Sequence, residues 1–105
     1  TKEKPIEFET NFTDFQINAE DAMRLALIVN ELVTNSVKHA FYDVENPLIK
    51  ISTKINTAGK LSLHYVDNGP KTMADLENNL PTESLGLKLI SLLKKQLGDQ
   101  YILMM

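Results

Sequence analysis

A long amphipathic segment from Asn18 to Ala40 constrains the fold of this chain more than any other feature. Apolar side chains recur there with the period of a helix, and Asn18 followed by Asp21 is typical of a helix cap. One wide face of the expected helix collects Ala22, Leu25, Ala26, Val29, Leu32, Val33, Val37 and Ala40. So broad an apolar face must be covered by another layer, and we expect a sheet.

Alternating apolar and polar residues predict the strands of that sheet. The first runs from Ile6 to Phe12 and should have one buried face. Two more run from Ile49 to Ile55 and from Lys60 to Val66, and the intervening Asn56-Thr57-Ala58-Gly59 is typical of a hairpin turn. The two later strands should therefore pair antiparallel.

The C-terminal part of the chain predicts a second helix and a last strand. Helical spacing of apolar residues begins at Ser84 and stops at Gly98, and residues 101–105 are typical of a strand. The polar stretch 70–83 is long enough to be a functional loop or lid. Together the elements predict an α+β fold, a two-layer α/β sandwich in which helices cover one face of a mixed, mostly antiparallel sheet.

Composition limits the classes of function. The 105 residues suffice for one domain, 1–105, and a net charge of -3 with scattered basic residues argues against a nucleic-acid surface. The absence of cysteine and the isolation of His39 and His64 exclude the usual zinc patterns. No apolar run is long enough to span a membrane, so we expect a cytoplasmic segment without membrane contact. Because the chain starts at Thr1, we expect it to be part of a longer protein, whose other parts are free to attach to a membrane.

A polar stripe interrupts the long helix opposite its apolar face. Glu31, Asn35 and Lys38 lie along one side, where they form either a solvated face or a ligand site. Leu27 and Ile28 are placed on the same side, which favours a partly covered surface. An amide oxygen suits Mg²⁺, a carboxylate can orient a water or accept a proton, and a lysine can meet phosphate. These three residue types fit a nucleotide-phosphate site.

Asp67 continues the inner face of the third strand. Leu61, Leu63 and Tyr65 alternate with that period, which puts the Asp67 carboxylate at the rim of the core. Asn68-Gly69 is also suited to a tight turn. A carboxylate at such a rim needs donors, and an adenine amino group is one of them. The turn and the ligand site do not exclude each other.

Gly86 lies in the first turn of the second helix, in the stretch Ser84-Leu85-Gly86-Leu87. Unpaired backbone N–H groups and the positive end of the helix dipole favour an anion there, and Gly86 has no Cβ to block a phosphate. A single glycine near a helix start is more often a packing accommodation. The position of Gly86 after the other two motifs in the sequence is stronger evidence for a phosphate site than the glycine itself.

The three motifs together resemble the ATP-binding catalytic domain of sensor histidine kinases, which belongs to the GHKL ATPases, and the resemblance spans almost the whole chain. Residues 31–41, ELVTNSVKHAF, are similar to the N box, and the ending KHAF resembles a subfamily related to the HWE kinases. Residues 66–69, VDNG, resemble the first glycine box, and residues 84–90, SLGLKLI, resemble the second.

The resemblance implies a GHKL ATPase fold and a role for each motif. Asn35 is implied as the Mg²⁺ ligand, Glu31 as the residue that assists in-line transfer, and Asp67 as the partner of the adenine amino group. Residues 70–83 are implied as the ATP lid. The remaining nucleotide contacts are implied for Lys38, His39, Gly69, Gly86 and Leu87.

The implied function is that of an enzyme domain in two-component signalling. With ATP and Mg²⁺ bound, it would supply the γ-phosphoryl group to a histidine on a separate dimerisation domain of the parent protein, and so act indirectly on a response regulator. Because phosphoryl transfer depends on positioning both partners, we expect the isolated domain to transfer nothing.

Two other functions remain open. One is an anti-sigma serine kinase of the same fold. The other is a nucleotide-free docking module for a phosphotransfer or response-regulator partner, which is favoured by Lys71 in place of a family glycine and by a chain that ends at Met105 inside an expected hairpin. Whichever function applies, we expect the sheet to lack its last strand or strands, and the open edge at Ile102 and Leu103 favours dimerisation.

Overall fold

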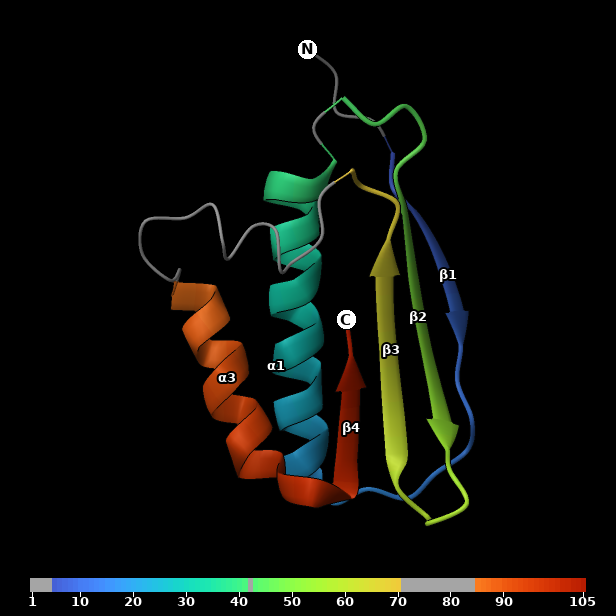
Figure 1. Ribbon diagram of the computed structural model, residues 1–105, viewed down its shortest axis with the longest axis vertical. Coiled ribbons are helices and arrows are strands. Elements are labelled where there is room, and N and C mark those ends of the chain that lie inside the picture. Colours follow the sequence, from blue (N-terminus) through green and yellow to red (C-terminus); the bar gives the residue numbers. More distant parts are fainter. Residues whose placement is uncertain (1–4, 42, 71–84) are drawn as a thin grey trace.

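The computed structural model describes residues 5–41, 43–70 and 85–105 and has two layers, helices against a sheet (Figure 1). α1 and α3 lie side by side and pack against each other. In chain order the elements are β1 Glu7–Asn11, α1 Ala19–Asn35, a π-helical turn Ser36–Ala40, β2 Leu48–Ile55, β3 Leu61–Asp67, α3 Leu85–Leu97, a 3-10 turn Gly98–Gln100 and β4 Tyr101–Met104. This confirms the predicted α+β class and the order of the elements.

The described strands form one mixed sheet in the order β1-β2-β3-β4. β2 and β3 are antiparallel, as the hairpin predicts, but β1 pairs with β2 and β3 pairs with β4 in parallel. The expectation of a mostly antiparallel sheet was therefore wrong. Each parallel pair is joined through a helix, α1 or α3, which carries the chain back to the end where the preceding strand began.

The buried stripe of α1 differs from the predicted one. Burial recurs at every fourth position, at Ile28 and Leu32 of α1 and then at Ser36 and Ala40 of the π-helical turn that follows it. Val37 and Ala26, which were expected in the core, are exposed, whereas Ile28 was placed on the polar side. The helix has two covered sides, one against the sheet and one against α3. The positions of the apolar residues alone therefore did not predict which side of the helix faces the core.

β1 forms where the alternation predicts it, but it has no buried face. All five of its residues are exposed, and Phe8 and Phe12 on the expected inner face are 51% and 58% exposed. Among the described strands, β1 lies at the edge of the sheet and pairs only with β2. The core is instead built from β2, β3 and the two helices, so the predicted buried face of the first strand was wrong.

The hairpin and the second helix end as their turn residues require. The Asn56 side-chain oxygen accepts hydrogen bonds from the backbone N–H groups of Ala58 and Lys60, at 3.0 and 2.9 Å. Gly59 and Gly98 have φ of +80° and +75°, a region that favours glycine. None of the helices in the described parts of the chain is long and apolar enough to cross a bilayer.

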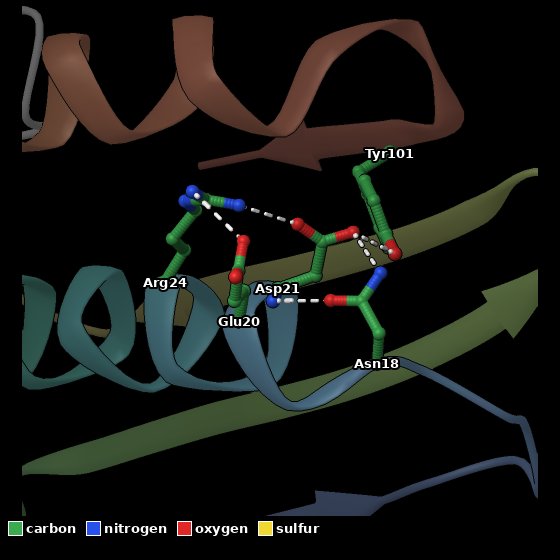
Figure 2. A network of polar contacts seen from close by, with 5 residues as sticks. All are labelled: Asn18, Glu20, Asp21, Arg24 and Tyr101. Carbon is green, nitrogen blue, oxygen red and sulfur yellow. Dashed lines mark hydrogen bonds and ion pairs between the residues drawn. The ribbon is translucent and has the colours of Figure 1, made fainter.

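The first turn of α1 is tied to β4 by a polar network (Figure 2). The Asn18 side-chain oxygen accepts from the backbone N–H of Asp21 at 2.8 Å, which confirms the predicted cap. Asp21 also accepts from the Tyr101 hydroxyl at 2.8 Å and pairs with Arg24 at 2.9 Å. Arg24 lies 3.6 Å from the exposed carboxylate of Glu20. The network therefore links segments 80 residues apart in the sequence.

Candidate functional site

The C-terminal end of α1 meets the end of β3 in a buried chain of hydrogen bonds. The Ser36 hydroxyl donates to Asp67 Oδ2 at 2.7 Å and lies 2.6 Å from the Tyr65 hydroxyl. Tyr65 Oη is also 3.2 Å from the carbonyl oxygen of Leu32. Burial raises the pKa of Tyr65 to about 12, so this group remains a neutral hydroxyl at neutral pH. This series of hydrogen bonds ends at the half-buried carboxylate of Asp67.

Asp67 lies where the strand alternation predicts it, at the rim of the core. Its second oxygen, Oδ1, accepts the backbone N–H of Gly69 at 3.0 Å. A Cβ on Gly69 would overlap the carbonyl oxygen of Ala40, so only glycine lets the chain leave β3 this close to α1. Both oxygens of the carboxylate thus have one protein donor, and each keeps further acceptor capacity.

Asn68 has a different role from the tight turn that the sequence suggests. Its side-chain oxygen accepts the backbone N–H of Leu48 and its side-chain nitrogen donates to the carbonyl of Asn46, both at 2.9 Å. Gly69 does not have a positive φ. The residue therefore fastens the end of β3 to the start of β2 and helps to fix the backbone next to Asp67.

Asn35 and Glu31 form a second polar group on the side of α1 that faces α3. Asn35 is only 8% exposed, and its amide nitrogen has no hydrogen-bond partner among the residues that the structure describes. A Cβ on Gly86 would lie 2.5 Å from Glu31 Oε2 and 3.8 Å from Asn35 Oδ1. The missing side chain of Gly86 thus makes room for the Glu31 carboxylate, which the sequence reasoning did not foresee.

The other predicted site residues are less closely gathered. Lys38 and His39 belong to the π-helical turn and are exposed, while the side chain of Leu87 is buried in the core. Apart from the exposed Pro70, the predicted lid at 70–83 lies outside the described residues, as does Lys71. The described part of the candidate site therefore wraps around the last turns of α1.

The π-helical turn follows Asn35 directly. It covers Ser36–Ala40, so the helix that begins at Ala19 ends in a π-helical turn. Asn35 and Ser36 are neighbours in the sequence and both are buried, because α1 is covered on two sides at this point. Asn35 lies on the side of Gly86, and Ser36 lies on the side of Asp67. One helix end thus connects the two polar groups.

Sequence reasoning missed Ser36 and Tyr65 as members of the site. Ser36 continues the four-residue spacing of Leu32 and Ala40, and Tyr65 precedes Asp67 by two residues on the same strand face. A buried tyrosine hydroxyl needs a hydrogen-bond partner. A serine on the helix that faces the strand could therefore have been predicted as the partner of Tyr65.

Comparisons with known proteins support the fold. No family model matches the chain, and no curated protein matches it. The histidine kinase domain of a blue-light activated histidine kinase from Erythrobacter litoralis is 24% identical over 89% of this chain, with a TM-score of 0.75. A second structure of that kinase is 24% identical over 91%, with a TM-score of 0.76. The chain spans 45% and 30% of those two chains. It therefore shares the fold of these histidine kinase structures.

Proposed function

We propose that this chain is a domain that binds Mg-ATP and, within a longer protein, supplies the γ-phosphoryl group for phosphorylation of a histidine on a separate dimerisation domain. The observation that carries the proposal is the amide of Asn35, which is buried with its nitrogen unpartnered within the described ranges. It lies beside Glu31 and Gly86, in a chain whose fold is that of a histidine kinase domain.

A buried polar group without a partner costs about 1–3 kcal/mol, so an amide in this position favours a ligand that satisfies it. The amide oxygen of Asn35 is a suitable ligand for Mg²⁺, and the nitrogen can donate to a phosphate oxygen. When bound, Mg²⁺ would neutralise charge on the phosphate oxygens. The amide of Asn35 is thus suited to bind a magnesium-bound phosphate.

Asp67 is the proposed contact for the base. Ser36 and Gly69 each donate one hydrogen bond to its carboxylate, which holds the group in place and leaves acceptor capacity. An adenine amino group is a donor of matching chemistry. Asp67 and Asn35 lie on two sides of the same helix end, so one nucleotide would reach both by following the surface of α1.

Glu31 is the proposed residue that assists transfer. Its carboxylate and the amide oxygen of Asn35 both border the space that a Cβ on Gly86 would occupy. A carboxylate at the phosphate end can orient the attacking group or accept its proton. Transfer also needs the histidine of the other domain, so we expect the chain alone to bind nucleotide without transferring phosphate.

Titration calorimetry with Mg-ATP, and with ATP in EDTA, tests the proposal. Asn35→Ala should weaken binding about tenfold or more when Mg²⁺ is present, and less than that in EDTA, where only the hydrogen bond from the amide nitrogen is lost. Asn30→Ala is the matched control, because Asn30 lies on the same helix but is exposed. No binding by the unmodified chain at millimolar nucleotide would contradict the proposal and favour a nucleotide-free docking module.

A further inference from the structure

We infer that Ser36 is a positioning residue which, supported by Tyr65, holds Asp67 as a hydrogen-bond acceptor and so makes the site select a purine with a 6-amino group over one with a 6-oxo group. The inference rests on the proposed function, because it concerns the base of the proposed nucleotide. It adds two residues, Ser36 and Tyr65, to which neither the sequence motifs nor the fold likeness gives a role.

The direction of the hydrogen bonds follows from counting protons. An ionised carboxylate only accepts, so the 2.7 Å contact with Asp67 uses the single hydroxyl proton of Ser36. The 2.6 Å contact between Ser36 and Tyr65 then requires Tyr65 to donate. The Tyr65 hydroxyl therefore donates to Ser36, and the Ser36 hydroxyl donates to Asp67. The carbonyl oxygen of Leu32 is more distant from Tyr65, at 3.2 Å, and at most shares the Tyr65 proton.

This order fixes what the carboxylate of Asp67 can recognise. Ser36 holds one of its oxygens and the Gly69 N–H holds the other, so the group is anchored at both ends. No proton remains at Asp67 that could be donated to a ligand. A purine amino group completes the pattern, whereas an oxo group would set two acceptors against each other.

Removal of the Ser36 hydroxyl should disturb Asp67 more than the fold. Ser36 has no exposed surface, and the change to alanine keeps the helix and deletes one atom. Tyr65 can then donate fully to the carbonyl of Leu32, which it already contacts. Asp67 alone loses a donor without replacement, so the effect should fall on the recognition of the base.

Calorimetry with Mg-ADP and Mg-IDP measures this selection, because the base of IDP carries a 6-oxo group and no amino group. Ser36→Ala should reduce the ratio of ADP affinity to IDP affinity about tenfold, and Tyr65→Phe about threefold, because Tyr65 acts on Asp67 only through Ser36. Ser62→Ala is the matched control, since Ser62 is also a buried serine, 8% exposed, but lies on β3 far along the strand from Asp67. The ratio of the two nucleotide affinities should not change in this control variant.

Amide exchange of Gly69 in the nucleotide-free chain gives a second readout. Because this N–H donates to Asp67, Ser36→Ala should speed its exchange about tenfold and Ser62→Ala should not. If the unmodified chain binds Mg-ADP but Ser36→Ala leaves both the ratio and the exchange unchanged, only this inference is overturned. If the unmodified chain binds neither nucleotide, the proposed function and the base selection fall together, even where the exchange responds.

Discussion

The two ends of α1 both carry carboxylates, amides and hydroxyls, but they use them differently. At the N-terminal end, Asp21 is engaged by Asn18, Arg24 and Tyr101 at once, so its network is closed (Figure 2). At the C-terminal end, the described contacts leave the amide nitrogen of Asn35 unpartnered, and Asp67 keeps acceptor capacity. The first end joins helix and sheet, whereas the second is left open.

Unused hydrogen-bonding capacity therefore marks a candidate site better than the presence of charge does. The pKa of Asp21 is lowered, chiefly by the hydrogen bond from Tyr101, because its ionised form is already stabilised by neighbours. A ligand could add little there. A buried amide without a partner is costly by itself, and a ligand would relieve that cost. We therefore attribute stability to the closed end and propose that a ligand binds at the open end.

Paired substitutions of the two aspartates should give the largest difference in nucleotide affinity between the two ends. Asp67→Asn should weaken Mg-ADP binding by about 1.5–3 kcal/mol, because a charged acceptor becomes a weaker neutral one. Asp21→Asn makes the same chemical change at the other end and should leave the affinity unchanged. Calorimetry of both variants measures the effect, and equal losses of affinity would contradict the division between the two ends.

The closed end should show its role in stability and in pH dependence. The folded pKa of Asp21 lies below the ordinary 3.8, so its contribution is present above that value and is lost as the pH falls through the folded pKa. Tyr101→Phe removes the main cause of the shift and should lower Tm at pH 7. Thermal unfolding from pH 7 to pH 3 should show this difference from the unmodified chain shrinking below about pH 4. A difference independent of pH would contradict the role of Asp21.

Gly86→Ala should affect nucleotide binding at the open end more than it affects stability. The new Cβ would lie 2.5 Å from the tip of the Glu31 side chain, which can move aside more easily than a backbone atom. We expect a stability loss below about 1 kcal/mol together with a weakening of Mg-ATP binding of about threefold. Denaturant unfolding and calorimetry separate the two effects. A large stability loss with unchanged binding would make Gly86 a packing residue only.

Lys38→Ala should give the smallest effect. Lys38 is exposed in the π-helical turn, where its charge is screened by solvent. We expect Mg-ATP affinity to fall by less than about 1 kcal/mol, with a loss that shrinks as salt is raised. Calorimetry at two salt concentrations provides the measurement. A loss as large as that of Asp67→Asn would place Lys38 inside the site instead of at its margin.

The elements of the fold could largely be read from the sequence, because each has a local signal. The cap at Asn18 and the hairpin turn at Asn56 form as predicted, since a side-chain oxygen there satisfies nearby backbone N–H groups. Strand direction could not be read in this way. It depends on which elements the helices connect, and that property belongs to the whole chain.

The candidate site was predicted in its residue types but not in its contacts. Asp67 lies at the core rim as the alternation predicts, and Asn35 is buried although it lies on a stripe that the sequence alone could assign to solvent. The position of Ser36 against Tyr65 depends on the phase of α1. That phase is set by packing on two sides, which a count of apolar residues does not reveal.

Mapping of backbone amide resonances during titration with Mg-ADP tests the contrast between the two ends most directly. Every amide is observed in the same sample, so neither end needs to be mutated. We expect the resonances of Ser36, Gly69 and Gly86 to move with one saturating curve, while those of Asp21 and Tyr101 stay in place. Shifts centred on Asp21 and Tyr101, or no shifts at millimolar Mg-ADP, would contradict the assignment of binding to the C-terminal end of α1.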